Sequence, residues 1–85
     1  MADSFERVLE RVLEIAQRST PPGSVISAET SLIRDLSLDS LQALELVSDV
    51  EMELGVGIPS EMLPEIDTLA DVARIVVRVQ SSDSQ

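Results

Sequence analysis

Apolar residues recur every three or four positions in three stretches of the chain, 3–18, 41–54 and 68–79. This spacing places them on one side of an α-helix, so the pattern predicts three amphipathic helices. The side chains expected to face inward are Phe5, Val8, Leu9, Val12 and Ala16 in the first, Ala43, Leu46, Val47, Val50 and Leu54 in the second, and Leu69, Val72, Ala73, Val76 and Val79 in the third.

Polar residues three positions apart mark the start of each helix. Such a pair can form a capping box, in which each side chain bonds the backbone N–H of the other residue. The pairs are Asp3 with Glu6, Asp39 with Gln42, and Thr68 with Asp71. The run of Ser, Thr, Pro and Gly at 19–23 is expected to stop the first helix, and Gly55 the second.

The two longer connections differ in character. Residues 19–38 are rich in turn formers but contain six large apolar side chains, so a long loop packed over the core is expected. These side chains are Val25, Ile26, Leu32, Ile33, Leu36 and Leu38. After Gly55, an extended segment leads to a short helical turn capped by Ser60 and ending near Pro64. The expected fold is therefore all-α, a four-helix bundle with a short third helix and a long loop between helices one and two.

Length and composition narrow the class of protein. A chain of 85 residues has room for one domain, 1–85, with a core over about 4–80 and a polar tail at 81–85. Cys, His, Trp, Tyr and Lys are all absent, which removes thiol and imidazole catalysis and Cys/His zinc sites. The N-terminus lacks a basic segment followed by an apolar run, and no stretch approaches the length of a membrane span, so a cytoplasmic protein without membrane insertion is expected.

The charge is strongly one-sided. Sixteen acidic residues face six arginines, giving a formal net charge of -10, which disfavours nucleic acid as a partner and opposes self-association, so a monomer is expected. Ten of the acids lie in the stretch 35–71, which has no basic residue. On the second helix, Glu45 and Asp49 share the outer side with Leu41 and Met52. This surface is either a solvated acidic face or a steering face for basic partners.

Ser40 is the residue with the clearest candidate chemistry. It is expected to open the second helix, where free backbone N–H groups and the positive end of the helix dipole stabilise a phosphate or phosphodiester. Serine is also common near helix starts for purely structural reasons, so position alone does not assign it a function.

Four motifs together resemble the acyl carrier protein family, of the discrete bacterial type, including the related peptidyl carriers. They are Asp39-Ser40-Leu41, Glu45-Leu46-Val47, Ile58-Pro59 and Thr68-Leu69-Ala70-Asp71. The resemblance runs from Phe5 to Val79. It implies that a phosphopantetheinyl transferase, using coenzyme A and Mg²⁺, attaches 4'-phosphopantetheine to Ser40, and that the thiol of this cofactor carries acyl groups as thioesters. A carrier of this kind is not an enzyme and needs no reactive side chain of its own.

The resemblance also implies roles for other residues. Asp39 and Leu41 would contact the transferase. Acyl-transferring, condensing and modifying enzymes with basic patches would bind a face made of Leu41, Gln42, Glu45, Ser48, Asp49, Met52 and Glu53. The space that encloses an acyl chain would be lined by Val47, Val50, Ile58, Met62, Leu63, Ile66 and Ala73.

Departures from the family pattern leave the pathway open. Carriers of fatty-acid synthesis usually have Gly, Asp, Met and Phe where this chain has Ser37, Gln42, Ser48 and Leu54. The cargo could therefore belong to a fatty acid, polyketide or related lipid pathway, or be a peptidyl or aminoacyl group. A different class also stays open, an unmodified acidic helical docking domain in which Ser40 is dispensable. A calcium-binding loop is excluded because Ser40 stands where its required Gly would be, and a hydrolase acting alone lacks an evident base.

Overall fold

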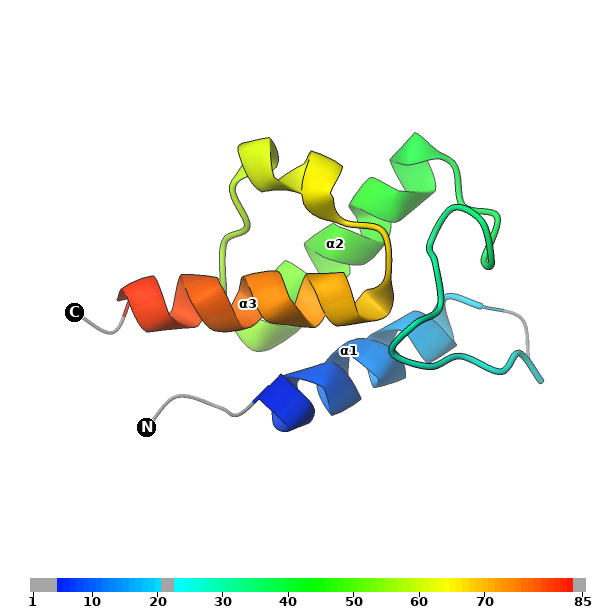
Figure 1. Cartoon of the computed structure of the whole chain (residues 1–85), viewed down its shortest axis with the longest axis horizontal. Helices are drawn as coiled ribbons and strands as arrows, with labels where there is room; N and C mark the ends of the chain where they lie inside the picture. Colours follow the sequence, from blue (N-terminus) through cyan, green and yellow to red (C-terminus); the bar gives the residue numbers. More distant parts are fainter. Residues whose placement is uncertain (1–4, 21–22, 84–85) are drawn as a thin grey trace.

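Three α-helices and one 3₁₀ helix form the described part of the chain. The structure is a computed structural model that describes residues 5–20 and 23–83, and the side chains as far as residue 80. The helices are α1 (Phe5–Arg18), α2 (Ser40–Leu54), η1 (Ser60–Glu65) and α3 (Leu69–Asp83) (Figure 1). The predicted all-α architecture with a short third helix is confirmed. None of the described helices is long and apolar enough to cross a membrane.

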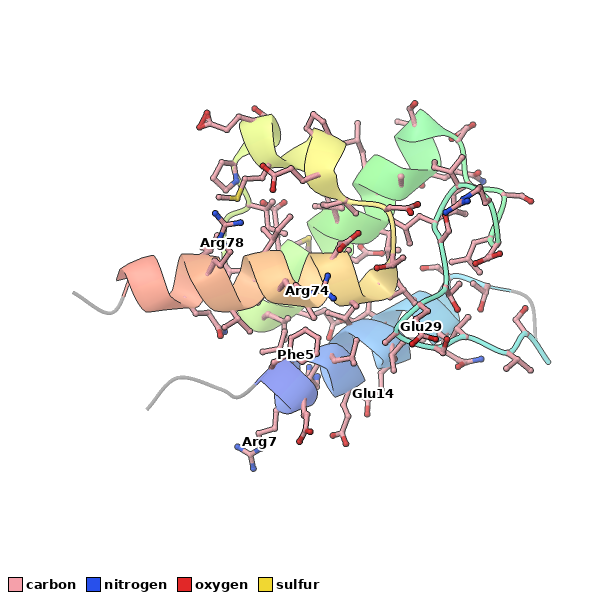
Figure 2. All side chains as sticks on the ribbon, in the orientation of Figure 1. Phe5, Arg7, Glu14, Glu29, Arg74 and Arg78 are labelled. Carbon is pink, nitrogen blue, oxygen red and sulfur yellow. The ribbon has the colours of Figure 1, made fainter. Side chains whose placement is uncertain are left out.

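The core lies where α1 packs against α3 and α2. Its fully buried aliphatic side chains include Val12, Val50 and Val76, one from each long helix. Ile15 and Ile75, which lie at the edges of the predicted inward faces, are also buried, with 2% and 3% of their surface exposed. Phe5 is only half-buried, and the guanidinium carbon of Arg74 lies 6.0 Å from the centre of its ring (Figure 2). The sole aromatic ring thus closes one end of the α1–α3 contact.

The capping boxes of α2 and α3 form as predicted. At α2, the backbone N–H of Gln42 donates to Asp39 Oδ1 at 2.8 Å, and that of Asp39 donates to Gln42 Oε1 at 3.2 Å. At α3, Thr68 N donates to Asp71 Oδ2 at 3.0 Å and Asp71 N donates to Thr68 Oγ1 at 3.2 Å. Gly55 ends α2 with a φ of 66°, a left-handed conformation that suits glycine. Asp3 of the remaining predicted pair lies outside the described residues.

The short helix η1 is held loosely. Ser60 is its first residue and not its cap, because Pro59 occupies the cap position without a side-chain hydrogen bond. Pro64 lies inside the helix, where it has no backbone N–H to donate, and none of the η1 residues is fully buried. Before η1, the N–H of Ile58 donates to Glu51 Oε2 of α2 at 2.7 Å.

The long loop between α1 and α2 packs over the core as predicted, through Leu32, with Ile26, Leu36 and Leu38 packed against it. Leu32 is buried, whereas Val25 and Ile33 are 93% and 52% exposed. An isolated antiparallel bridge joins Ser31 to Thr68, which ties this loop to the start of α3. At the other end of the chain, α3 continues through residues 81–83 of the predicted polar tail, and residues 84–85 lie outside the described part.

Candidate functional site

Ser40 is exposed as the first residue of α2. The capping box fixes the turn before it, so the backbone that carries its hydroxyl is held by Asp39 and Gln42. The first amide groups of a helix have no partner within the helix, and their dipoles favour an anion. The first turn of α2 has no acidic residue, but the Asp39 carboxylate at the cap accepts a hydrogen bond from the N–H of Gln42 and offsets part of this effect. The structure therefore presents Ser40 as an accessible hydroxyl in surroundings that suit a phosphodiester.

An apolar pocket opens beside Ser40. Three segments form it: the long loop, the first half of α2, and η1, which lies beside α2 on the opposite side of the molecule from α1 (Figure 1). The lining residues are Leu32, Ile33, Ser40, Ala43, Leu44, Val47, Leu63, Pro64 and Ile66. Its volume of about 320 Å³ is at the lower end of the roughly 300–1,000 Å³ of small-molecule sites. A chain attached at Ser40 would meet apolar surface directly.

Of the seven residues predicted to line an acyl chain, three line the apolar pocket and four lie in the core or against it. Val47, Leu63 and Ile66 line the apolar pocket. Val50, Ile58 and Ala73 are buried in the core, and Met62 packs half-buried against it.

Leu44 is a lining residue that helical periodicity did not single out. It falls between the inward and outward faces of α2 and is 45% exposed. An apolar side chain at such a boundary, one turn after Ser40, is the signal that could have found it.

The residues predicted to meet partners fall into two groups. Leu41, Glu45, Ser48, Asp49 and Met52 are all exposed and form what is called here the outer α2 face. Leu41 and Met52 are 66% and 81% exposed, so two large apolar side chains lie on this face among the polar ones.

Gln42 and Glu53 are engaged within the chain. Gln42 is exposed, with its amide in the capping box. Glu53 lies toward α1, where Arg18 Nη2 is 2.7 Å and Arg11 Nη2 is 3.5 Å from its carboxylate oxygens. Glu53 therefore joins α2 to α1, and its negative charge is compensated by two arginines of the same chain.

Ion pairs compensate some of the acids in the acidic stretch. Arginines outside the acidic stretch pair with acids inside it: Arg34 with Asp67 at 3.3 Å, Arg74 with Asp71 at 2.6 Å, and Arg78 with Glu65 at 3.9 Å. Figure 2 shows Arg74 and Arg78 along one side of α3. Within the described residues, Glu45, Asp49 and Glu61 have neither an ion pair nor a hydrogen bond to their carboxylates. Carboxylates of the described residues without an ion pair or hydrogen bond thus lie on the outer α2 face and η1, and also at Glu6, Glu10 and Glu29.

The comparisons with known proteins place this helical fold, with its exposed Ser40 beside an apolar pocket, in the class of phosphopantetheine-binding carrier proteins. The family model described as "Phosphopantetheine attachment site" matches residues 6–76. An acyl carrier protein of Rickettsia massiliae is 31% identical over 77 residues, which cover 89% of this chain and 90% of that protein. An acyl carrier protein of Rickettsia typhi is 30% identical over the same length.

A solved structure has the same fold. It is that of MacpD, an acyl carrier protein from Pseudomonas fluorescens involved in mupirocin biosynthesis, with a TM-score of 0.61 and 24% identity. The match covers 87% of this chain and 68% of that one. The chain belongs to the acyl carrier protein family. The predicted cofactor is thereby confirmed as covalently attached 4'-phosphopantetheine.

Proposed function

We propose that Ser40 is the attachment point of 4'-phosphopantetheine and that this protein carries acyl groups as thioesters to biosynthetic enzymes. One observation carries the proposal: the exposed Ser40 hydroxyl stands at the capped start of α2 and lines the apolar pocket. Thioester formation needs a thiol. The sequence contains no Cys, so the cofactor supplies this thiol.

The chain's own residues hold the attachment point and its charge. The Asp39–Gln42 box keeps Ser40 at the helix start, and the first amide groups of α2 stabilise the negative phosphodiester. Leu44, Val47 and Leu63 offer an acyl chain apolar contacts, which favours an acyl cargo over an aminoacyl one. The mechanism asks the protein only to hold, shield and present its cargo, as a carrier and not as an enzyme.

The outer α2 face supplies the partner contacts in this proposal. Glu45 and Asp49, which have no internal ion pair, attract enzymes with Arg and Lys patches and raise the rate of encounter. Leu41 and Met52 add apolar contact area. The phosphopantetheinyl transferase contacts Asp39 and Leu41. Like-charged faces oppose self-association, so the protein acts as a monomer in the cytoplasm.

The pathway is a fatty acid, polyketide or related lipid pathway. Similarity to the Rickettsia acyl carrier proteins and the shared fold with a carrier of mupirocin biosynthesis support this range. Gln42 and Ser48 differ from the usual residues of fatty-acid-synthesis carriers, and both are exposed on the face proposed to meet partners, which favours a specialised carrier.

Incubation with coenzyme A, Mg²⁺ and a broad-specificity phosphopantetheinyl transferase tests the proposal. The intact mass of the wild type is expected to increase by one phosphopantetheine, and that of Ser40→Ala to stay unchanged. Ser60→Ala is the matched control, since Ser60 is also an exposed serine at the start of a helix, and it should be modified fully. An unmodified wild type with a helical circular dichroism spectrum would support the unmodified docking domain instead.

A further inference from the structure

One residue, Asp67, joins two walls of the apolar pocket by its carboxylate and its backbone carbonyl. The loop wall contains Leu32 and Ile33, and the η1 wall contains Leu63, Pro64 and Ile66. Asp67 follows the η1 wall directly and binds the loop at three points. Its Oδ1 accepts from Ser31 Oγ at 2.7 Å, its Oδ2 from Arg34 Nη2 at 3.3 Å, and its backbone carbonyl from Leu32 N at 2.8 Å.

Ser31 is the buried centre of this contact. Only 2% of its surface is exposed. Its backbone N–H, its backbone carbonyl and its hydroxyl all form hydrogen bonds. Its N–H donates to Asp35 Oδ2 at 2.7 Å, and its Oγ accepts from Arg34 N at 3.1 Å while donating to Asp67. Removing the carboxylate of Asp67 would leave a buried hydroxyl without its acceptor, which is unfavourable in the closed arrangement.

Other contacts of η1 are weak by comparison. It has no side-chain cap, none of its residues is fully buried, and its ion pair from Glu65 to Arg78 is long and exposed. Its preceding segment is fixed to α2 by the bond from Ile58 N to Glu51. Apart from the packing of Met62 and Leu63 against the core, η1 is held by polar bonds at its two ends, and Asp67 is the end that adjoins the lining residues.

We propose that Asp67 is a positioning residue that, through Ser31 and Arg34, sets how far the apolar pocket beside Ser40 opens. With the contact made, the loop wall and the η1 wall stay together and limit the access of water to the pocket. With it broken, η1 moves away from the loop and a bound acyl chain becomes accessible. The consequence for cargo rests on the proposed function, whereas the coupling of the two walls does not.

Hydrogen exchange in the unmodified protein tests the coupling of the walls. The reporter is the amide of Leu32, which donates to Asp67 O, compared with the amide of Val76 in the core helix. In Asp67→Ala, the exchange of Leu32 should accelerate about tenfold relative to Val76, the scale expected for a lost charge-assisted bond to a buried group. Val12→Ala is the control, because it weakens the core far from the pocket and should accelerate both amides together. Equal acceleration of both amides in Asp67→Ala would overturn the proposal.

Thioester cleavage by hydroxylamine tests the consequence for cargo. Hydroxylamine attacks the thioester carbonyl carbon and releases the thiol, so the rate reports access to that bond. An octanoyl group reaches further into a pocket than an acetyl group, so the wild type should lose octanoyl more slowly. Asp67→Ala should raise the octanoyl rate to near the acetyl rate and leave the acetyl rate unchanged, and Asp67→Asn, which keeps an acceptor for Ser31, should fall between them.

The outcomes separate the two proposals. If the wild type takes no phosphopantetheine, the proposed function fails while the exchange experiment still decides whether Asp67 couples the walls. If octanoyl is protected equally in the wild type and in Asp67→Ala, Asp67 does not position the pocket although the carrier function stands. If the wild type loses octanoyl and acetyl at one rate, the pocket does not shield the cargo, and the role of Asp67 in shielding is overturned.

Discussion

Ser37 has a φ of 57°, so it adopts the left-handed conformation three residues before the candidate attachment serine. A residue with a Cβ pays a steric penalty of about 1–2 kcal/mol in this conformation, and glycine does not. Glycine is in turn more flexible in the unfolded chain, which offsets about 0.5–1 kcal/mol of the gain. Ser37→Gly should therefore stabilise the protein by about 0.5–1 kcal/mol, equivalent to an increase in Tm of about 2–8 °C for a domain of this size.

Thermal unfolding followed by far-UV circular dichroism measures this effect. The matched control is Ser48→Gly, which makes the same change at an exposed position inside α2. Because that backbone is helical, glycine should destabilise the protein by about 0.5 kcal/mol there. Opposite shifts of Tm would confirm that backbone conformation decides the sign. If Ser37→Gly left Tm unchanged or lowered it while Ser48→Gly behaved as expected, the assignment of strain to Ser37 would be refuted.

Three further predictions concern the contacts that hold the helices. Asp39→Ala removes the cap of α2 and should lower the free energy of unfolding by about 1 kcal/mol in urea titrations. Glu53→Ala removes the two ion pairs with α1 and should lower the free energy of unfolding by less than about 1 kcal/mol, seen as a small decrease in Tm. The difference in Tm between the variant and the wild type should disappear in high salt. The backbone N–H of Thr68, helped by that of Asp67 and by Arg74, lowers the pKa of Asp71 below its ordinary value of 3.8 although burial opposes this. The stability it contributes is therefore complete above the unfolded pKa and lost as the pH falls through the lower folded pKa, so the stability difference between wild type and Asp71→Asn should be largest above pH 3.8 and shrink below it.

Local chemistry explains why much of the fold could be predicted from the sequence. The capping box of Asp39 and Gln42 depends on residues three positions apart, and both reciprocal bonds form. Gly55 ends α2 in the left-handed conformation for a similarly local reason. Periodicity placed the centre of each inward face correctly. It missed Ile15 and Ile75, which are both buried. For Ile15 the reason is that α1 packs against both α3 and α2, which widens its buried arc beyond the predicted stripe.

The walls of the pocket depend on contacts that the sequence does not reveal. Asp67 and Ser31 are 36 positions apart, and nothing in the spacing of either indicates that they bond. Glu53 lies in the same acidic run as Asp49, yet only Glu53 lies within reach of Arg18. Leu44 becomes a lining residue only because η1 and the long loop meet over it. Such features arise from tertiary packing, which determines which side chains of a surface helix become part of a site.

Locating the modification on the loaded protein tests the central claim most directly. After treatment with the transferase, trypsin should release residues 35–74 as one fragment, because the sequence has no Lys or Arg between Arg34 and Arg74. That fragment contains four serines, at positions 37, 40, 48 and 60. Fragment-ion masses should place one phosphopantetheine on Ser40. Attachment to another of the four serines, or none in a folded protein, would contradict the account.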